Sequence, residues 1–505
     1  MLPRVTILMC SYLSKCSRYI FIAVNVYGEK PYDKIKRIQE VFFVKKTSRK
    51  ILAGVLAAAS LASLAACSDS SEGGGSANVE TTTTTAKTEW TGDNIEVTAD
   101  EGSLDTTLDT QGKTLKWMGT YDLNPTNDAN ERSAEVALFE DNYGAKIEYI
   151  PTTSGTRFDD LATAILGGSP PDIFIYEWRA FPYDIVKGQY QPIDSVVDWD
   201  DPMWADVKDQ ADKFLWNGEH YIAPLGYAFT DTQILMYNKT TIDENGFEDP
   251  YELYQKGEWN WNEFVSMMND FKGDDEERFG IAGWWANAFV YTAGDTIVTY
   301  DGNTFTNNMY SGKIERAQQT IESIWKNQLV KRGWFTGDVF TNGGETLFYS
   351  MGTWEYDEVA KAYPDDVIQI VPFPRDPDQD QDFMSKKIHA YMWVKGSDNA
   401  DCVKAWFDVN RLVNYDEQYK EITKQKYLAN NTGWTEEMYD LAMEFYDEDK
   451  FALAYDYGYG ISQYMGDEVM PDLYEGIVNE KYESWTQGRE TYMNIVDQEI
   501  AVYNN

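Results

Sequence analysis

The chain has 505 residues, of which 84 are acidic and 43 are basic, so its formal net charge is −41. A field of this sign repels phosphate backbones and anionic headgroups, and we expect no nucleic-acid partner and no membrane docking through a basic face. The sequence has no HExxH, CxxC, P-loop, GxGxxG or GxSxG pattern and only two histidines, which argues against zinc, nucleotide, dinucleotide and serine-hydrolase chemistry and predicts no metal site and no cofactor.

An export signal is predicted between Lys45 and Cys67. It has a basic start and then an apolar run, from Ile51 to Ala66, that is long enough for a signal peptide but short of the ~20 residues of a membrane span. The LAAC sequence that ends at Cys67 resembles the bacterial lipobox, which implies that Cys67 is lipidated and begins the mature protein. We therefore expect an extracytoplasmic protein held to the outer face of the cell membrane by lipid alone. The alternative is a short buried helix with a core cysteine.

Residues 1–43 do not fit this signal, because bacterial signals begin close to their basic patch. We interpret them as a mis-annotated upstream extension, with Val44 as a possible GTG start and 44–66 as the signal peptide; a real extension is the alternative. Removing 11 basic and 3 acidic residues before Cys67 leaves 32 basic and 81 acidic residues, a formal charge of −49. Cys402 is then the one cysteine in the folded body, which predicts no intramolecular disulfide and a small buried side chain.

The segment 67–112 is rich in Ser, Thr, Gly and Asp and has almost no aliphatic periodicity. We predict a flexible linker, whose end-to-end distance would be roughly 35 to 40 Å. The residues from Lys113 onward are too many for one hydrophobic core, so two lobes are expected.

Strands alternate with helices in the next stretch. The pattern predicts strands at 114–120, 146–151 and 172–176, and helices at 130–143 and 157–166. The third strand is apolar without alternation, as expected for a parallel strand covered on both faces. The fold class is therefore α/β. Ligands of such sheets bind beyond the carboxyl ends of the strands, which places these residues at one rim: Tyr121, Asp122, Thr156, Arg157, Glu177, Trp178 and Arg179.

Two later segments have a structural interpretation. An apolar face recurs at helical spacing in 313–328 and predicts a helix behind a second sheet. The acidic run from Asp376 to Asp382 imitates the start of a calcium loop, but Gln381 and Lys387 stand where glycine and glutamate are needed, so we predict a solvated acidic loop. Four tryptophans are assigned to packing: Trp117, Trp325, Trp393 and Trp406.

Five segments together resemble the maltose-binding-like family 1 of extracellular solute-binding proteins, which serve ABC importers. They are SPPDIFIYEW (169–178), NGEHYIAPLGYAFTDTQILMYNKTTIDENGF (217–247), GEWNWNEF (257–264), NGGETLFYSMGTWEY (342–356) and VPFPRDP (371–377). The similarity follows the family's order over nearly all of 113–505. One departure is Thr346-Leu347-Phe348, where the family usually has alanine-methionine.

The resemblance implies a two-lobed periplasmic-binding-protein-like fold, in which each lobe is a mainly parallel sheet flanked by helices and the lobes are joined by hinge crossovers. The first lobe would comprise 113–230 plus 388–435, and the second 231–387 plus 436–505. It further implies a monomer that closes on a small-molecule ligand and delivers it to ABC permease subunits, without catalysis.

A sugar ligand would explain the abundance of tryptophan, because a pyranose offers an apolar face to an indole ring and hydroxyls to polar side chains. By resemblance, Trp178 and Trp354 supply rings from facing lobes, Trp285 and Asn287 occupy a second-lobe loop, and Asp231 lies at a crossover. Further candidates are Arg157, Glu177, Tyr121 and Tyr464.

Three alternatives stay open. A lipid-anchored glycoside hydrolase would need two carboxylates about 5 to 10 Å apart across a sugar. A surface glycan-binding protein without a transport role would share the export signal and the aromatic residues. Within the importer class, the ligand could also be a peptide or another polar solute.

Overall fold

The computed structural model describes residues 104–125, 132–229, 232–333, 335, 337–341, 343–431 and 433–504. The predicted extension, signal peptide, lipidated Cys67 and most of the linker therefore lie outside the described residues. The last residues of the predicted linker are folded, because Leu104 is buried and the Thr110 hydroxyl donates to the Tyr143 carbonyl at 2.7 Å. None of the described helices combines the length and apolar character needed to cross a bilayer.

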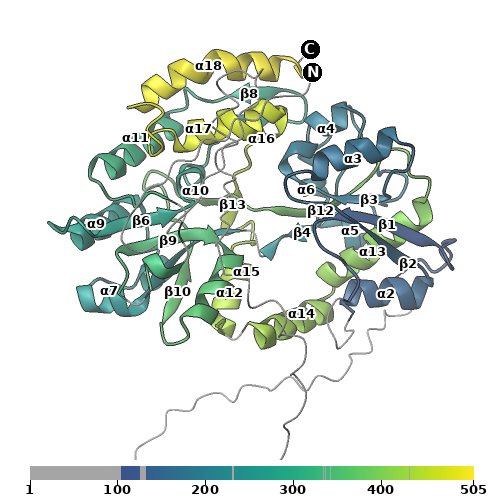
Figure 1. The fold of residues 1–505 in the computed structure, drawn as a ribbon, viewed down its shortest axis with the longest axis horizontal. Helices are drawn as coiled ribbons and strands as arrows, with labels where there is room; N and C mark the ends of the chain where they lie inside the picture. Colours follow the sequence, from purple (N-terminus) through teal and green to yellow (C-terminus); the bar gives the residue numbers. More distant parts are fainter. Residues whose placement is uncertain are drawn as a thin grey trace, which may run out of the picture. The chain divides into compact units, whose positions relative to one another are not determined.

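The first sheet has the strand order β2-β1-β3-β12-β4 and lies on the right of Figure 1. Its strands are β1 (Thr114–Gly119), β2 (Lys146–Pro151), β3 (Ile173–Ile175), β4 (Ala223–Tyr227) and β12 (Ile388–Trp393). The flanking helices include α2 (Ala134–Tyr143), α3 (Arg157–Leu166) and α13 (Ala400–Tyr415). The predicted alternation of strands and helices is confirmed, with α2 beginning after the Ser133 cap.

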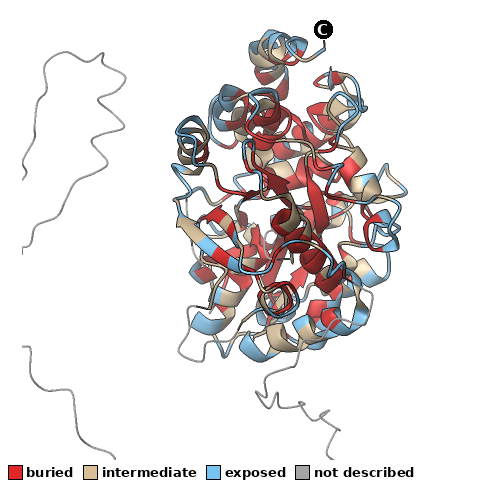
Figure 2. Ribbon diagram, turned by 90° about the vertical axis from the view of Figure 1, so that its right-hand side faces the viewer, coloured by how far each residue is buried: buried red, intermediate tan, exposed pale blue. Residues whose placement is uncertain are grey.

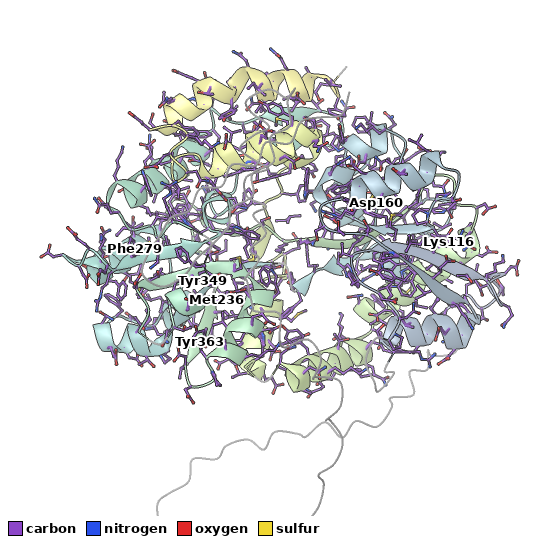
Figure 3. All side chains as sticks on the ribbon, in the orientation of Figure 1. Lys116, Asp160, Met236, Phe279, Tyr349 and Tyr363 are labelled. Carbon is purple, nitrogen blue, oxygen red and sulfur yellow. The ribbon has the colours of Figure 1, made fainter. Side chains whose placement is uncertain are left out.

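The second sheet has the order β10-β5-β9-β6 and lies on the left of Figure 1. Its strands are β5 (Gln233–Asn238), β6 (Phe279–Gly283), β9 (Thr346–Gly352) and β10 (Ile368–Val371). Met236 and Tyr349, labelled in Figure 3, are opposite one another on β5 and β9. The flanking helices include α7 (Lys239–Asn245), α9 (Trp261–Lys272) and α12 (Thr353–Ala362). The helix predicted at 313–328 is confirmed as α11 (Gly312–Lys326), but its main contacts are with α10 (Ala286–Tyr291) and α18 (Trp485–Ala501).

The remaining elements are short, apart from three helices. The helices are α4 (Tyr183–Val186), α5 (Pro202–Ala205), α6 (Lys208–Asp212), α8 (Pro250–Gln255), α14 (Glu417–Asn430), α15 (Glu436–Glu444), α16 (Gly458–Ile461), α17 (Met470–Glu475) and α18 (Trp485–Ala501). The tight turns are η2 (Trp178–Ala180) and η4 (Gly337–Val339), and η5 (Met465–Val469) is a π-helix. The strands outside the two sheets are β7 (Val298–Tyr300), β8 (Phe305–Asn307), β11 (Asp382–Met384) and β13 (Phe451–Leu453).

One strand in each sheet runs opposite to the others, namely β12 in the first sheet and β5 in the second. Both follow a crossover of the chain from one sheet to the other. The chain leaves β4 at its carboxyl end and enters β5 at the adjoining edge of the second sheet, so β5 must run away from that edge. The same holds for β12, whose first residue Ile388 is paired with Tyr227, the last residue of β4. The two-lobed α/β architecture is thus built around crossovers at facing sheet edges.

Buried residues concentrate on the strands and on the inner faces of the helices, as Figure 2 shows. Trp117, Trp393 and Trp406 are buried and Trp325 is partly buried against the core, which confirms their assignment to packing. Cys402 is also fully buried, as predicted.

An aromatic cluster joins the two lobes near α16 and α18. Phe214 of the first lobe lies 5.0 Å from Tyr455 and 5.3 Å from Phe181, measured between ring centroids. The Tyr300 hydroxyl donates to the Leu215 carbonyl at 2.9 Å. One hydrophobic core is therefore continuous between the lobes at this end of the molecule.

A buried carboxylate anchors the chain near this cluster. Asp456 accepts hydrogen bonds from the backbone N–H groups of Ile297, Val298 and Gly458 at 2.9, 3.2 and 2.8 Å, and from the Tyr474 hydroxyl. Burial raises the pKa of Asp456 to about 6, against the lowering effect of these donors.

A histidine between two carboxylates fixes a loop of the first lobe. His220 contacts Asp194 through Nδ1 at 2.6 Å and Asp212 through Nε2 at 2.8 Å. Burial opposes ionisation of both carboxylates, but hydrogen bonds from His220, together with Trp199 at Asp194 and Lys208 at Asp212, outweigh it and hold the pKa of each carboxylate below the ordinary value.

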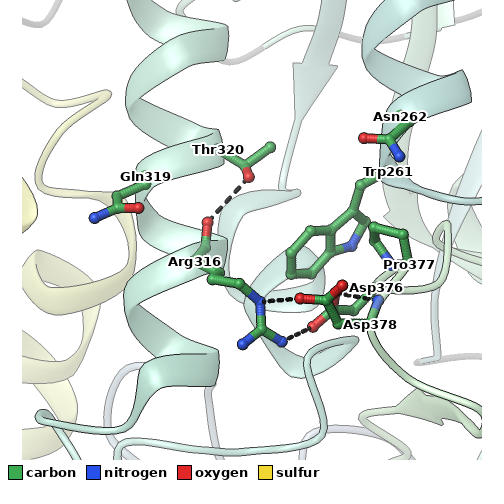
Figure 4. Close-up of a pocket in the computed structure, with 8 residues that line it drawn as sticks. All are labelled: Trp261, Asn262, Arg316, Gln319, Thr320, Asp376, Pro377 and Asp378. Atoms are coloured by element: carbon green, nitrogen blue, oxygen red, sulfur yellow. Dashed lines mark hydrogen bonds and ion pairs between the residues drawn. The ribbon is translucent and has the colours of Figure 1, made fainter.

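The acidic run at Asp376 is not wholly solvated, and that prediction is wrong for its first residue. The Asp376 side chain is buried and pairs with Arg316 at 2.6 Å, and Arg316 also lies 3.1 Å from Asp378 (Figure 4). Trp261 lies beside this ion pair, in a shallow pocket of about 300 Å³. Arg316, on α11, therefore pairs with the buried carboxylate, and a sequence pattern alone does not reveal this long-range contact.

Candidate functional site

A cavity of about 690 Å³ lies at the edge of the first sheet where the crossovers leave it. The described residues that line it come from the ends of β1, β3 and β4, from the loop between β2 and α3 and the start of α3, from the start of β12 and from α13. They are Thr120, Tyr121, Ser154, Arg157, Ile175, Glu177, Tyr227, Ala228, Phe229, Lys387, Ile388, His389 and Asn414.

The parallel register of the first three strands brings the predicted rim together. Gly119, the last residue of β1, is paired with Pro151, the last residue of β2, and β3 adjoins β1 on its other side. Tyr121, Arg157 and Glu177 follow these strand ends and all line the cavity. The placement expected from the carboxyl-end rule is therefore confirmed for these three residues.

Arg157 and Glu177 form a bidentate ion pair in the wall of the cavity. The guanidinium donates through Nε and Nη2 to the two carboxylate oxygens, and each side chain is 18% exposed. A third donor, Nη1, is bound to the Ser154 carbonyl, and the guanidinium lies 4.5 Å from the ring centroid of Phe158. These contacts fix the orientation of the pair, which presents polar atoms of both signs to the cavity.

The crossovers supply an aromatic part of the wall. Tyr227 stacks on Tyr446 with ring centroids 5.4 Å apart and donates through its hydroxyl to Glu448. Burial, followed by the contact with Glu448, raises the pKa of Tyr227 above its ordinary value, so it stays a neutral donor. Phe229 stacks on Tyr439 at 5.0 Å. Both rings are held from behind by the segment after α14.

An exposed tryptophan lies on the facing edge of the second sheet. Trp284 follows β6 directly and is 45% exposed. The backbone N–H of Trp284 donates to the Ser350 carbonyl at 2.8 Å, and the backbone carbonyl of Trp284 accepts from the Gln233 side-chain amide at 3.2 Å. Gly283 before it has φ +86°, and a Cβ there would lie 2.1 Å from the Ser350 oxygen, so only glycine allows this close approach.

Polar side chains adjoin Trp284 on the same edge. The amides of Gln233 and Asn287 exchange hydrogen bonds at 3.3 and 3.4 Å. Gln233 begins β5, next to the end of β9, where Gly352 is its strand partner. Asn287, a predicted ligand-binding residue, therefore lies at the second-lobe edge. The ring beside it is Trp284, which is one residue before the predicted Trp285.

Two of the predicted rings are engaged by the protein itself. Trp285 is 2% exposed and packs against Phe289 with centroids 6.3 Å apart. Trp178 is partly buried, and its ring centroid lies 6.3 Å from that of Phe158. Its indole also packs tightly against Gly466, because a Cβ added to that glycine would lie only 2.2 Å from the indole. Neither residue lines the cavity.

The other predicted residues have three different placements. Trp354 is partly buried on α12, where it packs against the second-lobe core. Tyr464 is 45% exposed and precedes the π-helix η5. Asp231 lies outside the described residues.

Several cavity residues were missed from the sequence. Tyr227 ends an apolar segment and could have been found by the same carboxyl-end rule as Tyr121. Lys387, His389 and Asn414 reach the cavity through long-range pairing of β12 and α13 with the first sheet, for which the local sequence has no signal. Among the described residues, no three His, Cys, Asp or Glu side chains are grouped to hold a metal ion.

Comparison with known proteins decides the family. Residues 126–409 match the family described as bacterial extracellular solute-binding protein. The chain belongs to this family. Its solute-binding role accordingly lies outside the cytoplasm. No curated protein matches the chain in sequence.

Solved structures share the fold of this solute-binding protein at low identity. An ABC substrate-binding protein from Listeria monocytogenes, in complex with cycloalternan, is 15% identical with a TM-score of 0.56, over 77% of this chain and 100% of that one. The sugar-binding protein MalE from Xanthomonas citri is 16% identical with a TM-score of 0.56, over 77% and 97%. A binding protein from B. animalis subsp. lactis, in complex with β-1,6-galactobiose, is 16% identical with a TM-score of 0.53, over 78% and 99%.

Proposed function

We propose that this solute-binding protein captures a sugar or short oligosaccharide between its lobes and delivers it to the permease subunits of an ABC importer. The observation that carries the proposal is the cavity at the crossovers, whose wall combines the exposed Tyr121 ring with the Arg157–Glu177 pair. A pyranose needs this combination of an apolar platform and charged hydrogen-bonding groups. The sugars bound by the structural relatives support the same class of ligand.

The second-lobe contribution is proposed to be Trp284 with Asn287 and Gln233, because these side chains occupy the sheet edge that adjoins the first crossover. Trp354, Asp231 and Tyr464 remain further candidates. On this reading Trp285 and Trp178 support the site from behind.

Capture is proposed to work by closure. The lobes, 113–230 plus 388–435 and 231–387 plus 436–505, pivot at the crossovers, and a ligand that contacts both edges shifts the population toward a closed form that the permease recognises. No bond is made or broken. Both oxygens of Glu177 are already engaged by Arg157, so this carboxylate is not poised as the acid of a glycoside hydrolase.

The anchor is proposed to be a lipid on Cys67, with the following segment as a tether and the protein as a monomer. Metabolic labelling with an alkyne-bearing fatty acid tests this part, because wild-type protein should be labelled and Cys67→Ala should not. Equal labelling of both would exclude this lipidation site.

The ligand is tested by a thermal-shift screen with mono- and oligosaccharides, followed by calorimetry on the hits. A ligand at 100 times its Kd stabilises the folded protein by about 2.7 kcal/mol. We expect a saturable shift with at least one saccharide and no new reducing ends on incubation. Binding of peptides alone, or turnover of the saccharide, would refute the proposal.

A further inference from the structure

A buried lysine lies where the crossover from β4 to β5 meets the crossover that leads into β12. Lys386 lies between β11 and β12, and its side chain is 0% exposed. It donates to the Phe451 carbonyl of β13 at 2.6 Å, and its ammonium is 4.0 Å from the Glu448 carboxylate. The ammonium also lies 5.0 Å from the ring centroid of Tyr227, which ends β4 and lines the cavity. One side chain therefore contacts both crossovers and a third segment, 445–453.

The third segment is tied to the first crossover as well. The Tyr446 hydroxyl donates to the Ala228 carbonyl at 3.0 Å and lies 2.9 Å from the Thr232 hydroxyl. β13 is paired with β11, which leads into the second crossover. The three segments thus form one hinge, with the Lys386 ammonium at its centre.

We propose that Lys386 is a positioning residue for ligand capture, whose side chain joins the crossovers before β5 and β12 to the 445–453 segment and whose charge sets how readily this joint opens. The residue acts through Tyr227, because the ammonium attracts the ring face and the carboxylate that binds the Tyr227 hydroxyl. The inference rests on the proposed closure for its purpose, but its test needs no ligand and can fail independently of it.

The charge at this position responds to pH in an accessible range. Burial lowers the pKa of Lys386 to about 8, Glu448 and Asp447 oppose the shift, and Lys213 adds to it. Tyr227 remains neutral throughout because its pKa is raised. The ammonium is mostly present near neutral pH and is lost above about pH 9. Because burial penalises the ammonium more than Glu448 and Asp447 stabilise it, the charged form favours an opened, hydrated hinge and the neutral form favours the packed one. The hinge therefore tightens as the pH rises.

The test measures the distance between the lobes in the unliganded protein by pulsed electron resonance. Spin labels are attached through a ketone-bearing amino acid at Leu166 and Val367, which are 89% and 55% exposed, so the cysteines are not involved. We expect a broad distance distribution at about pH 6.5 that narrows at about pH 9.5. Lys386→Met, which is neutral at every pH, should give the narrow distribution at both pH values.

Two controls keep the result interpretable. Because folding disfavours the charged form of a lysine whose pKa is lowered, Lys386→Met should melt no earlier than wild type near neutral pH, which a thermal scan checks. Lys450→Met removes an exposed lysine of the same segment, 52% exposed and paired with Glu444, and should respond to pH as wild type does. A wild-type distribution unchanged by pH, or a Lys386→Met protein that follows the wild-type response, would overturn the proposal.

Discussion

Replacing Trp284 by alanine tests the second-lobe half of the site. The ring is 45% exposed, which for an indole side chain is roughly 110 Å² of apolar surface available to a ligand. If a sugar covers half to all of it, the contact is worth about 1.4 to 2.7 kcal/mol, or ~10- to 100-fold in Kd. Stability of the unliganded protein should change less than for a fully buried ring, because nearly half of the side chain is already exposed to solvent.

The assay is isothermal titration of wild type and variant with the saccharide that gives the largest thermal shift. The matched control is the neighbouring Trp285→Ala. Its ring is 2% exposed, so its removal should cost about 3 to 5 kcal/mol of folding free energy. The two variants should therefore separate affinity from stability. An unchanged Kd in Trp284→Ala would show that the ligand does not reach this edge, and the reasoning from strand ends would fail for the second lobe.

Three further predictions concern polar groups. Glu177→Gln should raise the ligand Kd, measured by calorimetry, at least several-fold, because Arg157 loses the charge-assisted hydrogen bonds that orient it. An unchanged Kd would show that the Arg157–Glu177 pair does not contribute to ligand binding. Asp456→Asn should cost about 1 to 3 kcal/mol in urea unfolding, since one amide oxygen cannot serve donors that now bind two oxygens; an unmoved midpoint would contradict this. The pKa of Asp194 is lowered in the folded state, so its contribution to stability is complete above its ordinary pKa of about 3.9 and is lost as the pH falls through the lowered value. His220→Gln should therefore flatten the acid-side loss of stability, and parallel pH profiles would show that this contact carries no such linkage.

The first lobe could be predicted from the sequence because its elements are local. Each strand and helix from 114 to 176 has its own periodicity, and consecutive parallel strands place their ends at one edge. That rule found Tyr121, Arg157 and Glu177 without any knowledge of long-range contacts. It could not find Lys387 or His389, whose strand is inserted between β3 and β4 from far along the chain.

The second lobe was predictable only in part, because its site depends on register. Trp284 and Trp285 are adjacent, and successive side chains at a strand end point in opposite directions. A shift of one residue therefore decides which of the two tryptophans is exposed at the sheet edge and which is buried in the core. The sequence offers two tryptophans and no means to choose between them. In the structure, the tight approach of Gly283 to Ser350 turns the chain so that Trp284 is exposed and Trp285 is buried.

The division of the site between lobes bears on how closure is driven. The described residues that line the cavity belong to the first sheet, its helix α13 and the crossovers, so a ligand held by these alone would contact much the same groups in open and closed forms. A ligand shifts a conformational equilibrium only by the difference in its affinity for the two states. In the proposed mechanism that difference would come from the second-lobe edge at Trp284, and the Arg157–Glu177 pair would supply affinity common to both states. The aromatic cluster at Phe214 and Tyr455 packs between the lobes, so we propose that the edge swings about this end and brings the exposed indole toward the bound sugar.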